Sequence, residues 1–348
     1  MAQMMIKSPS PGAFIFVINI DGVGESFTMP TPNWNDAFTI HPVYDYYVSW
    51  GDGSPEDHIT AYNQAEATHD YTGKSGDFTI RVRGRMEIFR STGGFANDLM
   101  VVDFLQWGDV GLIELIGTFD SMRYMSYSAT DSPIVLGRGI TSLKNMFYYT
   151  GPQGFDPNDF GTFNGDISGW DVSEITDFRY FASECYWNMS LSGWDTSAGT
   201  DFDHMFSNNP IFNSPVDHFD VSNCANFHDM FYQCYAFNQP VGSWDVSNAT
   251  RLLGTFTACT VFNQDISAWT PINVESGNFV GMRFLLTGTA FSTTNYDLLL
   301  NAWSLLTFTN SGIRLSLNAA YTITTSQAAR NILTSAPNLW NISDGGGI

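Results

Sequence analysis

The sequence predicts a mixed α/β repeat protein, in which an N-terminal β-sandwich is followed by a solenoid of strand–helix coils. In the second half of the chain, aromatic residues recur every 24 or 25 residues, and a fixed period of this size is typical of stacked repeats. Before the repeats, short alternating segments are separated by turn residues, which favours a small sandwich. After Met282 the period fades, and we expect an atypical unit that shields the last coil.

These changes along the chain divide it into four predicted parts. We expect an N-terminal arm at residues 1–11, a β-sandwich at 12–92, a solenoid at 98–290 and a C-terminal capping unit at 291–348. Alternating apolar residues predict strands in the sandwich at 14–20, 44–50 and 76–84. The capping unit shows helical periodicity at 294–306 and 325–333, with a strand between them at 313–317.

One repeat shows what a coil should contain. Trp244 and Val246 alternate with Asp245, and the apolar spacing is that of a leucine-rich-repeat strand. Ser247 is a favoured helix N-cap, and the apolar residues that follow it reach Phe256 at i, i+3 and i+7 spacing. Each coil is therefore expected to hold a short strand, a serine cap and a short helix.

Two sets of recurring residues are interpreted as ladders of identical side chains. The aromatic set should face the core, because it alternates with aspartate, although a sugar-stacking platform is the alternative. The asparagine set should satisfy backbone groups in the turns. The aromatic residues are Trp170, Trp194, Phe219, Trp244 and Trp269, and the asparagines are Asn164, Asn188, Asn213, Asn238 and Asn263.

The outward aspartates of the coils are the candidate binding residues: Asp171, Asp195, Asp220 and Asp245. Carboxylates stacked about 5 Å apart repel each other by roughly 1 kcal/mol in water and about 3 kcal/mol at a surface-like dielectric. Hydrogen bonds from backbone N–H groups near a helix N-terminus could offset this repulsion. A bound cation or a basic partner could do the same, and both explanations remain open.

A metal site is predicted only in an insertion between repeats, where Asp156, Asn158 and Asp159 could hold a structural calcium ion. A polar surface turn is the alternative. No other cofactor is expected. The four cysteines form neither a CxxC nor a zinc pattern, so we expect buried free thiols.

Composition limits the classes of partner. The formal net charge of −21 leaves no basic stripe for nucleic acid. Residues 1–20 show neither an export signal nor a membrane span, so we expect no membrane insertion. The six histidines occupy no catalytic motif, and His204 and His228 are expected on helices, facing solvent or an interface.

Two resemblances to known families can be drawn. Trp-Gly-Asp-Gly-Ser at 50–54, with His69, Tyr71 and Phe78, resembles a PKD-like domain, which implies a non-catalytic extracellular spacer or adhesion module. Residues 230–239 read Met-Phe-Tyr-Gln-Cys-Tyr-Ala-Phe-Asn-Gln. Together with the Ser-x-Trp-Asp-Val-Ser repeat, this segment resembles the BspA-like leucine-rich-repeat surface proteins. That resemblance implies surface exposure and adhesion. Relatives of these repeats are also expected in phage genomes, where cell lysis releases the protein and no export signal is needed.

We therefore expect a non-catalytic, surface-displayed binding or adhesion protein. The favoured hypothesis is a bacteriophage virion structural protein, such as a capsid decoration, a fibre or a tail adhesin, located on the virion surface. Its partners would be other virion proteins or a host-surface protein or glycan, and it could form a homo-oligomer. The first alternative is a secreted bacterial cell-surface adhesin. The second is a carbohydrate-active enzyme that uses two carboxylates.

Overall fold

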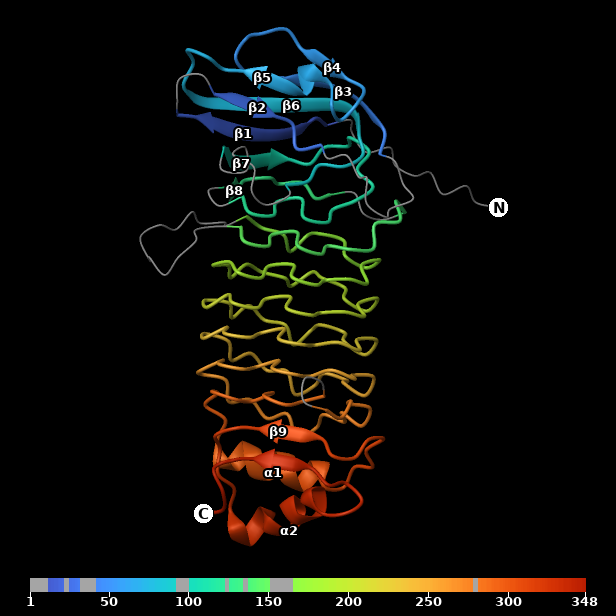
Figure 1. Ribbon diagram of the computed structural model, residues 1–348, viewed down its shortest axis with the longest axis vertical. Coiled ribbons are helices and arrows are strands. Elements are labelled where there is room, and N and C mark those ends of the chain that lie inside the picture. Colours follow the sequence, from blue (N-terminus) through green and yellow to red (C-terminus); the bar gives the residue numbers. More distant parts are fainter. Residues whose placement is uncertain are drawn as a thin grey trace, which may run out of the picture.

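The computed structural model describes residues 12–21, 25–31, 42–91, 100–122, 125–133, 137–150, 165–277 and 281–348. Figure 1 shows an elongated molecule with a β-sheet at one end, a stack of coils in the middle and two helices at the other end. The chain runs through these three parts in order, so each coil lies between the coil before it and the coil after it.

An open six-stranded sheet forms the N-terminal end, with strand order β4-β3-β6-β1-β7-β8. In β1, every second side chain is buried, as expected for a strand with one face on a core. β1 pairs antiparallel with β6 and β7, and β7 pairs parallel with β8. The strands are β1 Phe14–Ile20, β3 Tyr44–Ser49, β4 Asp57–Ile59, β6 Gly76–Met86, β7 Val101–Gln106 and β8 Ser126–Tyr127.

A separate two-stranded sheet joins β2, Ser26–Thr28, to β5, Thr68–Asp70, which follows the short 3₁₀ helix η1, Ala65–Ala67. Phe27 of β2 lies 5.8 Å from Phe16 of β1, measured between ring centroids. Both side chains are fully buried. The small sheet therefore shares its core with the large one.

The loop after β3 carries a buried polar network. Asp52, whose side chain is inaccessible to solvent, accepts hydrogen bonds from the backbone of Ser54 and contacts His69 Nε2 at 2.8 Å and the Lys74 ammonium. The His69 ring stacks on Trp50 at 4.9 Å, and the Tyr71 hydroxyl donates to the Trp50 carbonyl at 2.8 Å. These contacts fix the loop between β3 and the small sheet.

The predicted sandwich at 12–92 requires a correction. In its place the structure has the open six-stranded sheet, and two of its strands, β7 and β8, lie beyond residue 92. The second edge of β1 pairs with β7, which lies after the predicted boundary. This pairing satisfies backbone donors and acceptors of β1 that would otherwise lack partners. The sheet passes directly into the first coils.

The predicted solenoid of strand–helix coils is wrong. Within the described residues from 137 to 292, the chain forms turns and isolated parallel bridges, with no helix and no named strand. The bridges connect Ser142 to Asp177 and continue coil by coil through Asp201, Asn226, Arg251 and Gly281.

Backbone pairing between coils explains why the expected helices do not form. The N–H groups of Phe202, His204, Phe206 and Asn208 donate to carbonyls of the next coil at 2.7–2.9 Å. A helix would use these donors within its own segment. Left-handed residues recur in this stretch, including Tyr180, His204 and Asp229 with φ of 50–55°. Because these positions break helical geometry, the chain turns there. The backbone N–H groups of alternate residues are then available to the next coil.

The core of the stack consists of aromatic rows. Phe231 lies 5.8 Å from Phe206 and 5.7 Å from Phe256, between ring centroids. All three are fully buried. Backbone pairing holds successive coils in one register. Side chains that are 25 residues apart in the sequence therefore contact each other.

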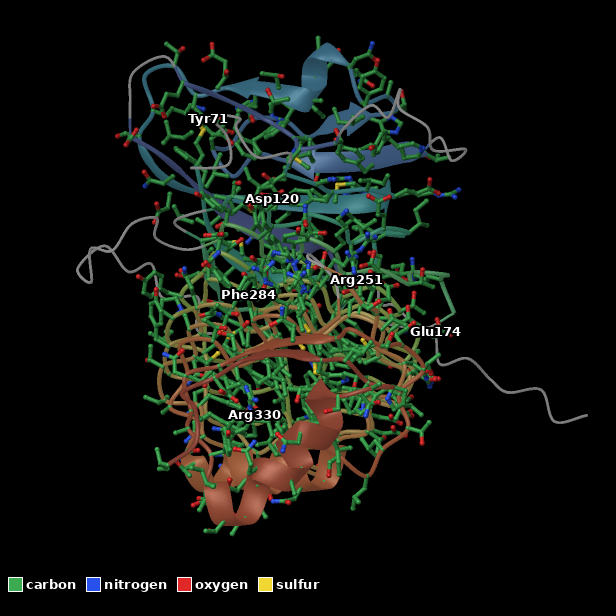
Figure 2. All side chains as sticks on the ribbon, turned by 60° about the horizontal axis from the view of Figure 1, so that its bottom comes forward. Tyr71, Asp120, Glu174, Arg251, Phe284 and Arg330 are labelled. Carbon is green, nitrogen blue, oxygen red and sulfur yellow. The ribbon has the colours of Figure 1, made fainter. Side chains whose placement is uncertain are left out.

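The C-terminal unit covers the last coil. It contains helix α1, Thr293–Trp303, strand β9, Arg314–Ser316, helix α2, Ile323–Thr334, and strand β10, Asn341–Ser343, which pairs parallel with β9. Arg330 on α2, labelled in Figure 2, pairs with Asp344 at 2.8 Å. The predictions of both helices and of the strand between them are confirmed.

Candidate functional site

The four predicted binding aspartates are all exposed. In each, the carboxylate accepts a hydrogen bond from the backbone N–H of the residue two positions later, at 2.9–3.1 Å. Such short-range bonds are typical of Asx turns. The residues are Asp171, Asp195, Asp220 and Asp245.

The local bonds affect the electrostatics of this aspartate row. Hydrogen bonds from Ser197 and Ser247 lower the pKa of Asp195 and Asp245, respectively. Both carboxylates are thus held ionised at neutral pH. The backbone bonds account for the local geometry, while the outer oxygens stay open to a partner.

The aromatic row is buried beneath the aspartates. Trp170, Trp194, Phe219, Trp244 and Trp269 are each at most 4% exposed. The indole N–H of Trp244 donates to the Val216 carbonyl at 3.0 Å, and that of Trp269 donates to the Val241 carbonyl at 2.8 Å. The rings therefore lie inside the stack, where a sugar could not stack on them.

The asparagines form a hydrogen-bonded row along one edge. The Asn188 Oδ1 atom accepts the backbone N–H of Asn213 at 2.8 Å, and the pattern repeats from Asn213 to Asn238 and from Asn238 to Asn263 at 2.9 Å. Asn263 passes the pattern to Ser292 at the start of the cap. Asn164, with the predicted calcium ligands Asp156, Asn158 and Asp159, lies outside the described residues.

A second polar cluster, which sequence reasoning missed, lies on two neighbouring coils. Asp203 Oδ1 is 2.7 Å from His204 Nδ1 and 3.0 Å from His228 Nδ1. On the far side of the rings, Asp229 Oδ2 is 3.5 Å from His204 Nε2 and 3.3 Å from His228 Nε2. We call these four residues the His–Asp cluster. Its two imidazoles are held between two carboxylates.

A glycine makes room for this cluster. Position 254 is equivalent to 204 and 229 in the coil register, and a Cβ there would lie 1.9 Å from Asp229 Oδ1. Gly254 also has a φ of +65°, which glycine adopts without steric cost. A larger residue at this position would displace the Asp229 carboxylate.

The cluster shifts the pKa of its members. The hydrogen bond with Asp203 raises the pKa of His228, although burial opposes the change. Burial alone would raise the pKa of Asp203, but the hydrogen bonds with both histidines outweigh it and lower that pKa. Burial raises the pKa of Asp229. Within the cluster, therefore, the pKa of Asp203 is lowered, while the pKa values of His228 and Asp229 are raised.

The sequence did contain a signal for this cluster. His204 and His228 occupy adjacent coils, and each has an aspartate beside it. The helix prediction placed the histidines one turn before Phe206 and Phe231, on a face toward solvent or an interface. Because the coils pair through their backbones instead, residues 24 apart become neighbours.

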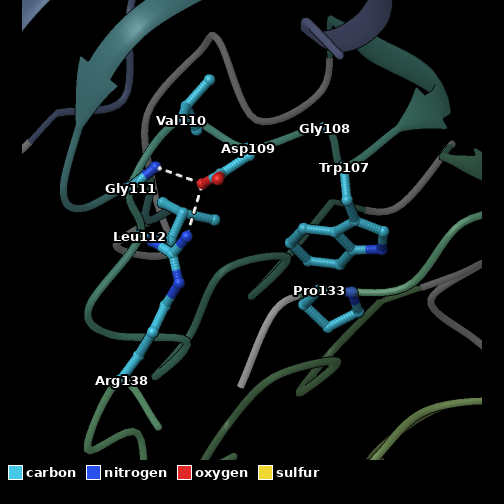
Figure 3. Close-up of a pocket in the computed structure, with 8 residues that line it drawn as sticks. All are labelled: Trp107, Gly108, Asp109, Val110, Gly111, Leu112, Pro133 and Arg138. Carbon is cyan, nitrogen blue, oxygen red and sulfur yellow. Dashed lines mark hydrogen bonds and ion pairs between the residues drawn. The ribbon is translucent and has the colours of Figure 1, made fainter. Parts of the chain in front are cut away.

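Cavities also lie elsewhere among the described residues. The one shown in Figure 3 is lined by Trp107 and Pro133 and has a volume of about 10 Å³. Arg138 there pairs with Asp109 at 2.5 Å. This space suits roughly one water molecule. A groove of about 400 Å³ lies between the last coil and β9, and is lined by Arg283 and Arg314.

A family model matches part of the chain. Residues 141–269 match the family model described as "Mycoplasma protein of unknown function, DUF285", which is a BspA-like family. The matched segment contains the aspartate row and the His–Asp cluster, and leaves out the N-terminal sheet and the helical cap. No curated protein and no solved structure matches the chain. The match supports the BspA-like part of the resemblance and extends to neither the PKD-like nor the phage part.

Proposed function

We propose that this chain is a non-catalytic, surface-displayed binding protein, whose coil stack presents rows of identical side chains to a partner. The observation that carries the proposal is the aspartate row. One exposed carboxylate recurs at the same place in four successive coils, and each is fixed by its own backbone. Extended periodic surfaces of this kind are what stacked-repeat proteins commonly use for binding.

The chemistry of the row selects the partner. Its carboxylates lie on a chain with a formal net charge of −21, so a basic protein patch, or a glycan bridged by a divalent cation, is complementary. The N-terminal unit is proposed to act as a PKD-like spacer. In it, the residues that carry the resemblance contact one another: His69 stacks on Trp50 and bonds to Asp52, and Tyr71 bonds to Trp50.

No helix in the described part of the chain is long and apolar enough to cross a membrane. Display on a virion surface remains the favoured proposal for location, and display on a cell surface is the alternative. Mass spectrometry of purified virions and of a cell-envelope fraction separates the two. Detection only in the envelope fraction would reject the virion assignment.

The binding proposal is tested by removing charge from the row. The double variant Asp220→Asn, Asp245→Asn keeps an acceptor for each backbone N–H and deletes two charges. Binding to a glycan array with Ca²⁺, and to surface layers of bacterial and epithelial cells, should weaken severalfold. Binding by the unmodified protein should also fall as salt rises, because exposed charges are screened.

A matched control is Glu66→Gln with Asp70→Asn, which removes the same charge from exposed positions of the N-terminal unit. Asp70 also accepts the backbone N–H two residues later, at 2.8 Å. The control should bind like the unmodified protein. If the row variant keeps full binding and loses only stability, the aspartates serve the fold and the proposed site is wrong.

A further inference from the structure

We propose that Asp203, His204 and His228 form a zinc-binding site that joins two neighbouring coils. The inference is independent of the proposed partner binding, since the cluster and the aspartate row are different residues. Its basis is a set of three ligand atoms, one from each residue, that lie within 4.8 Å of one another.

The donor geometry is close to that of a bound ion. In a tetrahedral site with bonds of about 2.0–2.1 Å, neighbouring ligand atoms are about 3.3 Å apart. Asp203 Oδ1 lies 2.7 Å from one Nδ1 atom and 3.0 Å from the other. A small outward movement of the carboxylate brings both of these distances to the value of a zinc site.

Asp229 supplies the support that zinc-binding histidines need. A histidine that binds metal through one nitrogen commonly donates its other N–H to a carboxylate, which fixes the ring. Here one oxygen, Asp229 Oδ2, lies within 3.5 Å of both Nε2 atoms. In the tautomer that carries the proton on Nε2, next to Asp229, the Nδ1 lone pair of each ring is on the side of Asp203.

Nδ1 lone pairs that face a carboxylate oxygen at this distance need a proton or a metal ion between them. An Nδ1–H group supplies that proton, and a metal ion takes its place on binding. In a neutral ring the displaced proton is replaced by one on Nε2, and from a cationic ring it passes to solvent, so no oxidation is involved. Three protein ligands leave one position for water or for a donor from a partner.

The choice of metal follows from the ligand types. Two imidazoles and one carboxylate favour Zn²⁺ and similar transition metals, whereas Ca²⁺ and Mg²⁺ prefer all-oxygen sites. The nearby cation Arg179 is engaged by Asp177 at 2.8 Å. The Tyr180 ring stacks on His204 at 4.7 Å and limits its rotation.

The test uses untagged full-length protein treated with a chelator. Calorimetry with ZnCl₂ should show one ion per chain, and the thermal midpoint should rise. Co²⁺ should give the visible absorption of a tetrahedral N/O site. CaCl₂ should produce no comparable shift. Absence of zinc binding, or an equal response to Ca²⁺, overturns the assignment.

Variants locate the site. His204→Asn and His228→Asn should each abolish the zinc response, and Asp229→Asn should weaken binding by roughly 10–100-fold by removing outer support. His58→Asn is the matched control, because His58 also pairs with an aspartate, Asp45, at 2.7 Å. Circular dichroism confirms folding, and ¹⁵N shifts of the imidazoles report metal contact directly. Zinc binding retained by both ligand variants, or lost in the control, rejects the site.

Discussion

At the scale of single residues, burial decides most roles in this molecule. Trp244 is 4% exposed, stacks on Trp269 at 6.3 Å and uses its indole N–H on a backbone carbonyl. The adjacent Asp245 is exposed. Neighbours in sequence thus have opposite functions, one in the core and one on the surface.

Trp244→Ala should lower the free energy of unfolding by roughly 3–5 kcal/mol, because it removes a large buried ring and leaves a cavity. Urea unfolding followed by circular dichroism measures the change. Tyr235→Ala, at a residue that is 38% exposed, should cost much less. Equal losses for the two variants would contradict a buried tryptophan row.

Asp52 should make the N-terminal unit sensitive to acid. Burial raises its pKa, but hydrogen bonds from Lys74, Ser54 and His69 outweigh burial and lower it. A carboxyl whose pKa is depressed on folding stabilises the protein above its unfolded pKa of about 3.9, and this contribution is lost as pH falls below that value.

Asp52→Asn should therefore be less stable than the unmodified protein at pH 7, and the difference should shrink as the pH is lowered from about 5 toward 2. Urea midpoints at several pH values measure it. A stability difference that stays constant across this range would show that the Asp52 charge contributes nothing.

At the scale of the element, the coil takes the place of the helix and the strand. Each coil donates backbone hydrogen bonds to the next through alternate residues, while i to i−3 bonds close its own turns, as from Met205 to Phe202 at 3.1 Å. The asparagine row adds side-chain bonds between successive coils. Stability of a coil thus depends on its neighbours.

Asn213→Ala tests the asparagine row. Asn213 Oδ1 accepts both the backbone N–H of Asn238 and the side-chain amide of Gln239. Its loss leaves partly buried donors without a partner and should cost about 1–3 kcal/mol. Asn223→Ala, at an exposed amide that bonds to Ser197, should cost less, because water can replace it. The reverse order in urea unfolding would reject the row's structural role.

At the scale of the whole molecule, the coils stay in register because each contains a similar number of residues. Deleting residues 226–250 joins Ala225 to Arg251, which occupies the same bridge position as Asn226. Phe206 would then meet Phe256, and the inter-coil backbone N–H donors of residues 202–208 would find equivalent acceptors, while the His–Asp cluster would be lost. The shortened chain should fold, with a lower thermal midpoint.

Deleting only residues 226–237 provides the comparison, because half a coil places polar residues against the aromatic rows. That chain should not fold. Circular dichroism and thermal melting measure both deletions. If the half-coil deletion melts as cooperatively as the full-coil deletion, the coil register is not what holds the stack together.

The sequence by itself determined the period, the inward aromatic residues, the free cysteines, which are buried, and the elements of the cap. These features depend on local alternation and spacing, which a single chain displays directly. The strands 14–20, 44–50 and 76–84 belong with them, since β1, β3 and β6 lie there.

Only the tertiary structure decided what a coil is made of and where its polar residues meet. The apolar spacing after Ser247 is compatible with a helix. In the structure, however, backbone N–H groups of this segment donate to carbonyls of the neighbouring coil, and the segment forms turns instead. The His–Asp cluster depends on the same pairing, since His204 and His228 touch only when coils lie in register. Long-range backbone hydrogen bonds outweighed local helix propensity, and their partners cannot be read from one repeat alone.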